Sequence, residues 1–155
     1  MKPRLERLRR RKGFTLLEMM AVVMIIGLLM TLIGTQVAER INLARVTVTQ
    51  AKIKQLEAAL EMYRMDNARY PSTEQGLMAL VERPSGTPEP KRWQPGGYVK
   101  RNMIQDSWQE DLQYSRPGSN NPRSFDLWSL GADSTPGGEG SDADVGNWVD
   151  EVTGG

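Results

Sequence analysis

A 21-residue apolar run from Phe14 to Gly34, broken by a single charge at Glu18, most limits what this chain can become. As a helix, such a run rises roughly 30 Å, the thickness of a bilayer core. A carboxylate in lipid costs about 2.5–3.5 kcal/mol near mid-bilayer, so Glu18 is expected to have a partner. The run therefore predicts a membrane anchor that is also an assembly surface.

The charges of the chain are unevenly distributed. Residues 1–13 hold seven of the 20 Lys+Arg and one of the 19 Asp+Glu, which leaves a net charge of −5 for the remainder. A short basic run beside an apolar span indicates a cytoplasmic N-terminus, not a nucleic-acid surface. A cleaved secretory signal has a shorter apolar region and a small-x-small site after it, which this sequence does not match. A plain single-pass anchor explains the span and its basic flank but not Glu18.

The helical pattern continues beyond the apolar run. Ile53, Leu56, Leu60 and Tyr63 recur on one helical face. We expect one long helix over Thr15–Asp66 that is apolar all round in its first half and amphipathic in its second. The stripe in the second half is interpreted as core packing against a soluble domain, in preference to a groove for a partner.

The rest of the chain predicts short elements joined by loops. Ser72-Thr-Glu-Gln75 fits a capping box at the start of a helix. The expected elements are a short helix at Gly76–Val81, strands at Leu112–Ser115 and Phe125–Leu130, a Gly- and Asp-rich loop at Gly131–Gly146, and a last element at Asn147–Val149. The predicted fold class is α+β, with the long helix packed on a small antiparallel sheet.

Several kinds of chemistry are excluded by composition. The sequence has no Cys and no His. Disulfides, thiol chemistry, His-based triads and His-ligated zinc are therefore excluded. Asp106, Asp111 and Asp126 form no pattern that demands acid–base catalysis, so we predict no catalytic residues and no enzyme activity.

The junction between the basic leader and the apolar run carries a specific motif. Arg11-Lys-Gly-Phe-Thr-Leu-Leu-Glu18 resembles the processing site of type IV pilin-like proteins. The resemblance implies that a prepilin peptidase cuts between Gly13 and Phe14 and methylates the new amino terminus of Phe14. It also implies that Glu18 pairs with the N-terminal amine of the next subunit during assembly.

The resemblance extends through the rest of the chain. The chain is similar to the major pseudopilins of type II secretion systems in Leu60–Val81, Gly96–Tyr98, Asp106–Trp108, Ser129–Asp133 and Asp144–Trp148. Type IV pilins usually end in a disulfide-closed loop, which a chain without Cys cannot form. The sequence departs from the family at Thr35, where a Pro is frequent, and at Asp106-Ser-Trp-Gln109, where Asp-Pro-Trp-Gly is frequent.

The resemblance implies a domain organisation and a set of partners. Residues 1–13 form a cleaved leader, residues 14–37 the transmembrane and assembly helix, and residues 38–155 a periplasmic pilin-like domain that includes the amphipathic half of the helix. The implied product is a helical homopolymer in the periplasm, anchored in the bacterial inner membrane, that drives export of folded proteins. Implied partners are minor pseudopilins, the inner-membrane secretion platform with its cytoplasmic ATPase, the prepilin peptidase and the lipid bilayer.

An acidic loop is the second candidate site. Asp133, Glu139, Ser141, Asp142 and Asp144 lie within twelve residues among many glycines. Ca²⁺ takes about six to eight oxygen ligands, but the spacing is not that of an EF-hand. From the residues alone, a solvated acidic turn and a metal site remain equally open. The resemblance implies one structural Ca²⁺, held by the side chains of Asp133, Asp142 and Asp144 and the carbonyls of Leu130, Thr135 and Ser141.

Alternative functions remain open at this point. The alternatives within the same class are a type IV pilin and a minor pseudopilin at the fibre tip. The alternative from another class is a membrane-anchored, Ca²⁺-dependent periplasmic hydrolase that would use Asp106 or Asp126.

Overall fold

The computed structural model describes residues 13–148, except for the side chains of residues 32–36, 38 and 39. The predicted leader before Gly13, the side chain of Thr35 and the end of the last predicted element at Val149 lie outside the described residues. Contacts divide the chain into two units, residues 1–39 and 40–155, and each is described by itself.

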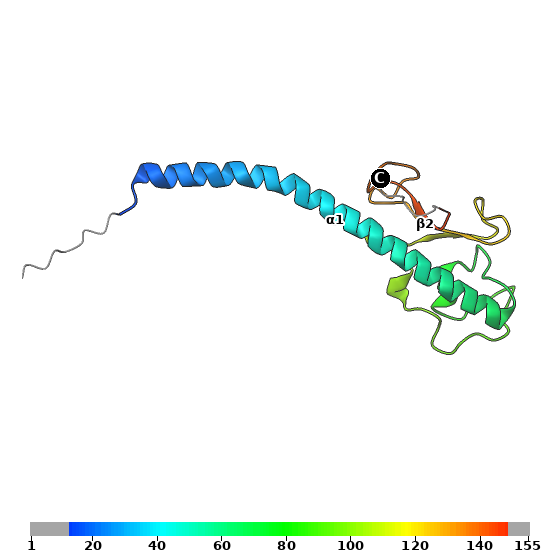
Figure 1. Ribbon diagram of the computed structural model, residues 1–155. Helices are drawn as coiled ribbons and strands as arrows, with labels where there is room; N and C mark the ends of the chain where they lie inside the picture. The colour runs from blue at the N-terminus through cyan, green and yellow to red at the C-terminus, as the bar shows by residue number, and fades with distance from the viewer. Residues whose placement is uncertain (1–12, 149–155) are drawn as a thin grey trace, which may run out of the picture. The chain divides into compact units, whose positions relative to one another are not determined.

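Helix α1 covers Leu16–Asn67, one residue later at each end than the sequence predicted (Figure 1). It begins with a reciprocal cap, because the Thr15 backbone N–H donates to Glu18 Oε2 at 2.8 Å and the Glu18 N–H donates to Thr15 Oγ1 at 3.2 Å. These bonds satisfy helix-terminal donors in the manner of a capping box. The helix ends where Ala68 adopts a left-handed φ of 61°.

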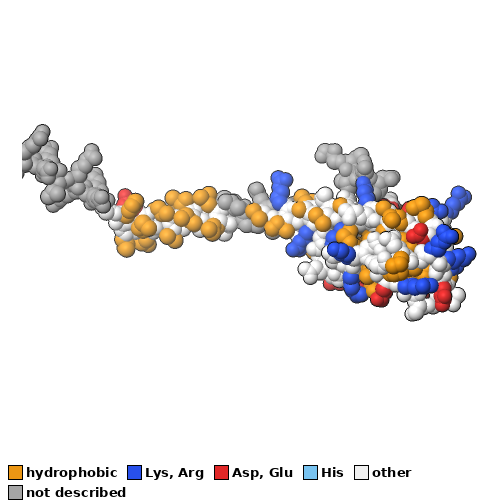
Figure 2. Space-filling view, turned by 90° about the horizontal axis from the view of Figure 1, so that it is seen from below, with side chains coloured by type: hydrophobic (Ala, Val, Ile, Leu, Met, Phe, Trp, Pro, Cys, Tyr) orange, Lys and Arg blue, Asp and Glu red, His pale blue; other side chains and the backbone are white. Residues whose placement is uncertain are grey.

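In the first unit, α1 carries apolar side chains on every side. Those between Phe14 and Met30 are exposed, and hydrophobic atoms cover this part of the helix in Figure 2. Such a helix is apolar all round, as the sequence predicted. Among the described residues, no helix combines the length and the apolar content that crossing a membrane requires.

In the second unit, one face of α1 forms the centre of the core. Ile53, Leu56, Leu60 and Tyr63 are each at most 3 % exposed. They join a cluster that includes Leu80 from a short helix and Leu127 from the sheet. The prediction that this stripe is core packing is therefore confirmed.

The sheet has three antiparallel strands in the order β1-β2-β3. Strands β1 (Gln113–Ser115) and β2 (Asp126–Ser129) confirm the two predicted strands at slightly shorter lengths. Strand β3 (Val145–Gly146) was not predicted, because a two-residue strand in a Gly-rich segment has no alternation to detect. It pairs with the end of β2, with Ser129 opposite Val145.

The region after α1 contains one predicted helix at a shorter length and one helix that was not predicted. The capping bonds between Ser72 and Gln75 form as predicted, at 3.1 and 3.3 Å. The predicted short helix at Gly76–Val81 is present as a shorter 3₁₀ helix, η1, at Leu77–Leu80, because Gly76 adopts a φ of 56° that interrupts helical geometry. A second 3₁₀ helix, η2 (Arg101–Met103), was not predicted.

Candidate functional site

Glu18 already has a partner within its own chain. Its Oε2 accepts hydrogen bonds from the Thr15 backbone N–H at 2.8 Å and from the Thr15 hydroxyl at 3.1 Å. The described residues give Oε1 no hydrogen bond. Sequence reasoning missed this role, although Thr15-x-x-Glu18 is a capping-box pattern. One oxygen of Glu18 is thus used by the helix start, and the other remains available to a second group.

The expected cleavage point lies just before the helix. Phe14 is 84 % exposed, and a Cβ added at Gly13 would meet no atom within 4 Å. The described residues thus leave the Gly13–Phe14 bond uncovered, as access by a peptidase requires.

In the acidic loop, Asp133 is bound to its own turn. Its Oδ1 accepts from the Thr135 N–H at 3.1 Å, and its Oδ2 accepts from the Thr135 hydroxyl at 2.7 Å. Hydrogen bonds from Thr135, first the hydroxyl and then the amide, hold the pKa of Asp133 below its ordinary value. The carboxylate is therefore an exposed anion that stabilises a turn.

Asp144 differs because one of its oxygens is buried without a hydrogen bond. Its Oδ2 accepts from the Gly137 N–H at 3.1 Å. Its Oδ1 is buried and has no hydrogen-bond partner among the described residues. A buried acceptor left unpaired costs about 1–3 kcal/mol, so this atom points to a missing donor or cation.

Two glycines approach the backbone of Asp142 closely. A Cβ at Gly131 would lie 2.6 Å from the Asp142 carbonyl oxygen, and one at Gly138 would lie 2.4 Å from it. Both glycines also have positive φ, at 73° and 83°, so only Gly fits this backbone. A side chain at either position would therefore clash with the Asp142 carbonyl oxygen.

The structure does not bring all the predicted calcium ligands together. Among the described residues, no group of three or more Asp, Glu, His or Cys side chains is arranged to hold a metal. Asp142 is exposed and its Oδ1 is 3.5 Å from the Ser141 hydroxyl. The Ser141 carbonyl accepts the Ala132 N–H at 2.9 Å. The orphaned oxygen of Asp144 fits a cation, whereas the full set of carboxylates does not converge.

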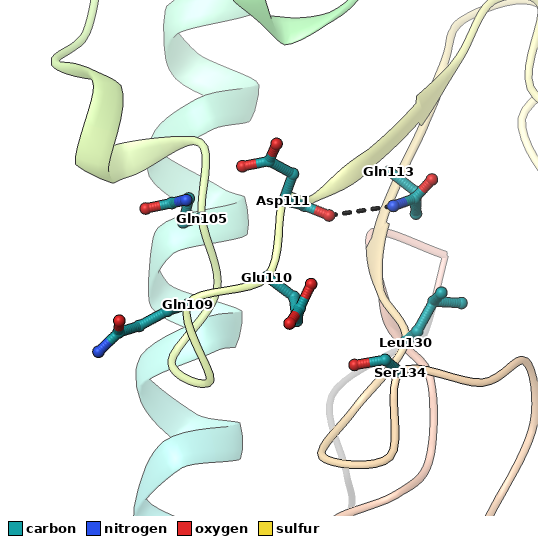
Figure 3. Close-up of a pocket in the computed structure, with 7 residues that line it drawn as sticks. All are labelled: Gln105, Gln109, Glu110, Asp111, Gln113, Leu130 and Ser134. Atoms are coloured by element: carbon teal, nitrogen blue, oxygen red, sulfur yellow. Dashed lines mark hydrogen bonds between the residues drawn. The ribbon is translucent and has the colours of Figure 1, made fainter.

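A polar pocket lies beside the start of this loop. It has a volume of about 290 Å³ and is shown in Figure 3. Its lining combines amides, carboxylates and one apolar side chain, from Gln105, Gln109, Glu110, Asp111, Gln113, Leu130 and Ser134. One hydrogen bond joins two of the residues drawn in Figure 3: the Gln113 side chain donates to the Asp111 carbonyl at 3.0 Å. The pocket thus lies between the loop that follows β2 and the segment that leads into β1.

Asp106 and Asp126, the carboxylates of the hydrolase alternative, are bound into the fold. The Oδ1 of Asp106 accepts from the N–H groups of Trp108 and Glu110, and its Oδ2 accepts from the Ser129 hydroxyl at 2.5 Å. Asp126 accepts four hydrogen bonds of 2.8–3.1 Å from Asn120 and Asn121. Both residues are at most 3 % exposed. These contacts explain both carboxylates as structural acceptors.

The departure at Ser107 and Gln109 is accommodated locally. The Ser107 N–H donates to Thr49 Oγ1 at 3.2 Å, and the Thr49 hydroxyl donates to Ser107 Oγ at 3.0 Å. A Pro at this position would lack that N–H. Gln109 has a φ of 71°, a conformation that favours Gly. The segment therefore retains a turn suited to Gly but binds α1 through a serine.

Comparison with known sequences identifies the family. The model of the family described as "Type II secretion system (T2SS), protein G" matches residues 36–148. The chain belongs to this protein G family. The "Prokaryotic N-terminal methylation motif" matches residues 8–34. These matches confirm the resemblance proposed from the sequence.

Relatives of the protein G family cover nearly the whole chain. A type II secretion system core protein G from Pseudomonas aeruginosa is 51 % identical over 140 residues, which is 90 % of this chain and 96 % of that protein. The core protein G from Vibrio cholerae is 43 % identical over 144 residues, which is 93 % of this chain and 96 % of that protein.

A solved structure supports the fold assignment. The crystal structure of the major pseudopilin from the type 2 secretion system of enterohaemorrhagic Escherichia coli has a TM-score of 0.59 and 42 % sequence identity. The match covers 68 % of this chain and 83 % of that chain. The predicted α+β, pilin-like fold class is confirmed.

Proposed function

We propose that this chain is a structural subunit of a type II secretion pseudopilus that assembles through the first half of α1. The observation that carries the proposal is the coincidence of two features in one helix. Exposed apolar side chains cover the segment from Phe14 to Met30, and Glu18 near its start keeps one carboxylate oxygen free of hydrogen bonds from the described residues. Exposed apolar surface of this extent marks a lipid or protein contact.

Processing at the helix start would complete the assembly site. Cleavage between Gly13 and Phe14, followed by methylation of Phe14, creates a positive amine four residues from Glu18. The Oε2 atom of Glu18 stays with Thr15, and its Oε1 pairs with the amine of the next subunit. In lipid, where neither charge is well solvated, such a pair meets the electrostatic need of both groups.

The proposed location follows from the sequence run and the family. The apolar run to Gly34 spans the inner membrane once before assembly, with the basic leader in the cytoplasm and residues 38–155 in the periplasm. The partners are other copies of the chain, minor pseudopilins, the secretion platform with its cytoplasmic ATPase, and the prepilin peptidase. The assembled fibre drives export of folded proteins, and the subunit itself is not an enzyme.

The acidic loop is proposed to hold one structural Ca²⁺. The support is the buried, unpaired Oδ1 of Asp144 and the close approach of Gly131 and Gly138 to the Asp142 carbonyl. The resemblance adds the side chains of Asp133 and Asp142 and the carbonyl oxygens of Leu130, Thr135 and Ser141, which do not all converge with Asp144 in this structure. The ion would offset part of the negative charge of the loop and couple its own binding to the folding of this segment.

The first test is the intact mass of the protein recovered from its native membrane. Loss of Met1–Gly13 with one methyl group added on Phe14 is the expected result. An intact leader in cells that contain the peptidase would contradict the proposed assembly route and leave a plain membrane anchor.

The second test separates the assembly role of Glu18 from its capping role. Glu18→Ala is expected to leave an inserted subunit that forms few fibres, because the amine of the next copy loses its counter-charge. Thr15→Val removes the hydroxyl contacts to Glu18 but keeps the carboxylate, so fibres are expected to form. Fibres are counted after shearing from cells that overproduce the secretion system. Equal fibre yields from Glu18→Ala and the wild type would contradict the charge pairing.

The same experiment tests the alternative that this chain is a minor pseudopilin at the fibre tip. A major subunit forms homopolymers when overproduced, whereas a tip subunit does not. Fibres made of this chain alone would therefore exclude the tip role.

A further inference from the structure

A chain of hydrogen bonds leads from the segment before β1 to the start of the acidic loop. Asp106 Oδ2 accepts the Ser129 hydroxyl at 2.5 Å, and Ser129 Oγ accepts the Gly131 backbone N–H at 3.2 Å. Asp106 and Ser129 are at most 3 % exposed, so water has little access to these bonds. A buried carboxylate is thus connected to the loop through one serine.

The donors and acceptors along this chain follow from the groups themselves. A backbone N–H can only donate, so Gly131 uses a lone pair of Ser129 Oγ, and the single hydroxyl hydrogen goes to Asp106. The Oδ1 atom of Asp106 accepts the N–H groups of Trp108 and Glu110 at 2.8 and 3.0 Å. Both oxygens of Asp106 therefore have donors, and the residue acts on the loop only through Ser129.

The bond to Gly131 fixes the orientation of a peptide group that carries a proposed calcium ligand. The Gly131 N–H and the Leu130 C=O belong to the same peptide bond, which is planar and trans. In such a group the two bonds point in opposite directions, so the Leu130 carbonyl oxygen faces away from Ser129 Oγ. The peptide group cannot rotate without breaking the bond to Ser129. The carbonyl is therefore oriented before an ion binds.

Gly131 also packs against the segment that leads to Asp144. Its φ is 73°, and a Cβ added there would lie 2.6 Å from the Asp142 carbonyl oxygen. On the other side of the loop, Val145 directly follows Asp144 and lies opposite Ser129 in the sheet. The residues around Ser129 therefore belong to both ends of the loop, and a change at Ser129 would disturb both.

The segment that carries Asp106 is itself held by α1. The buried Thr49 exchanges two hydrogen bonds with Ser107, at 3.0 and 3.2 Å. Lys52 Nζ donates to the carbonyl oxygens of Gln105 at 2.8 Å and Asp106 at 3.2 Å. These contacts do not involve the loop, so they hold Asp106 in place whether or not an ion is bound. A ligand is positioned most accurately when its support lies on a rigid element of this kind.

We propose that Asp106 is a positioning residue of the calcium loop, which orients the Leu130 carbonyl through Ser129 and so raises the affinity of the loop for Ca²⁺. This inference rests on the calcium site proposed above and adds a residue that does not touch the ion. Groups that hold a metal ligand in its orientation typically contribute about 10–100-fold to metal affinity.

A matched pair of substitutions tests the positioning role. In Asp106→Asn the amide nitrogen cannot accept, so either Ser129 or the backbone N–H groups lose their acceptor. Asp126→Asn makes the same change at an equally buried carboxylate, whose bonds go to Asn120 and Asn121 instead of the loop. Ca²⁺ is titrated calorimetrically into the full-length chain in detergent. Asp106→Asn is expected to raise the dissociation constant by about tenfold or more, equivalent to about 1.4 kcal/mol, and Asp126→Asn to leave it within about twofold.

Thermal unfolding in chelator separates positioning from a general loss of structure. Both variants remove an acceptor from buried donors, so both are expected to unfold at a lower temperature without Ca²⁺. A merely structural role for Asp106 would lower this temperature and leave the dissociation constant unchanged. Only a positioning role changes both.

A spectroscopic readout uses Tb³⁺, which prefers oxygen ligands as Ca²⁺ does. Its luminescence lifetimes in H₂O and D₂O count the water molecules bound to the ion. Ser129→Ala removes the link to the loop but leaves Asp106 its bonds to Trp108 and Glu110. This variant is expected to bind Tb³⁺ with about one more water, in place of the Leu130 carbonyl. Ser134→Ala, at an exposed serine of the same loop, is the control and is expected to leave the count unchanged.

The outcomes distinguish this inference from the calcium site on which it rests. An unchanged dissociation constant in Asp106→Asn, or an unchanged water count in Ser129→Ala, would overturn the positioning role and leave the calcium site intact. Absence of Ca²⁺ binding by the wild type would overturn the calcium site itself.

A measurement on the wild type decides if either variant fails to fold. Because Ser129 holds the Gly131 N–H before an ion binds, this amide is expected to exchange its hydrogen slowly in chelator. Exchange at Gly131 as fast as at the exposed Gly140 would show that the peptide group is not held, and would overturn the inference.

Discussion

Carboxylates in two regions of the second unit differ in burial and in hydrogen bonding. In the sheet region, Asp106 and Asp126 are buried and every oxygen accepts at least one hydrogen bond. In the loop between β2 and β3, Asp133 is exposed and Asp144 keeps a buried oxygen unpaired. Aspartate side chains are thus buried and fully hydrogen-bonded in one region, whereas in the other they are exposed or keep one buried oxygen unpaired.

The difference shows how a carboxylate can be assigned a role from its surroundings. Where neighbouring N–H and O–H groups satisfy both oxygens of a buried carboxylate, as in Asp106 and Asp126, the carboxylate holds a turn and no unpaired oxygen points to a ligand. Where an oxygen is buried without a donor, the desolvation cost remains and a cation can offset it. This comparison favours structural roles for Asp106 and Asp126 and a binding role for Asp144.

The largest effect is expected from removing a fully bonded carboxylate. Asp126→Ala leaves the donors of Asn120 and Asn121 without their acceptor, so we expect a loss of at least about 3 kcal/mol in the free energy of unfolding. Asp126→Asn keeps one acceptor oxygen and should lose less. Urea unfolding of the full-length chain in detergent, followed by Trp fluorescence, measures both. A loss below about 1 kcal/mol for Asp126→Ala would contradict a structural role for this residue and would favour a functional one.

The next effect concerns the unpaired oxygen in the loop. Adding Ca²⁺ at about one hundred times its dissociation constant would stabilise the wild type by about 2.7 kcal/mol. Asp144→Asn is expected to abolish most of this gain while changing stability little in chelator. Glu139→Gln, at an exposed acidic residue of the same loop, is expected to retain the gain. Thermal unfolding with and without Ca²⁺ measures the difference, and an equal shift in Asp144→Asn would remove the proposed site.

The sequence predicts those parts of the molecule that repeat a period. The long helix and its buried stripe extend over many turns, so their pattern was clear. The leader motif, together with later segments such as Leu60–Val81, indicated the family. Strand β3 has two residues, so no period could reveal it, and the positive φ of Gly76 shortens the predicted helix to the four residues of η1. The cap between Thr15 and Glu18 was visible as a pattern but was overlooked beside the proposed assembly role.

The acidic loop shows a different limit of sequence reasoning. Its composition indicates a cation site, but which oxygens converge depends on backbone conformation at several glycines. Glu139 and Asp142 resemble Asp144 in the sequence, yet only the structure shows that an oxygen of Asp144 is buried without a partner. Ligand sets in such loops follow from tertiary geometry, which spacing alone does not determine.

The smallest expected effect concerns a carboxylate between these two extremes. Glu61 accepts a hydrogen bond from the Tyr70 hydroxyl and pairs with Arg64 at 2.8 Å, while about 44 % of its side chain remains exposed. The Tyr70 hydroxyl, more than Arg64, holds the pKa of Glu61 below its ordinary value of 4.5. Burial, and then Glu61, raises the pKa of Tyr70.

The signs of the two shifts predict different pH limits. A lowered pKa for Glu61 contributes stability above pH 4.5 that is lost as the pH falls through the folded-state pKa, whereas the Tyr70 contribution is lost at alkaline pH. As the pH falls from about 6 to about 3, the wild type loses the Glu61 contribution to its free energy of unfolding. Tyr70→Phe lacks most of that contribution and should therefore lose less over this range. The difference should be about 1 kcal/mol or less, because solvent screens Glu61. Tyr114→Phe is the control, since its hydroxyl donates to the Pro71 carbonyl and to no carboxylate. If the free energy of unfolding fell equally with pH in Tyr70→Phe and the wild type, a half-exposed carboxylate would gain nothing from one phenol. The comparison between the two regions would then apply only to buried groups.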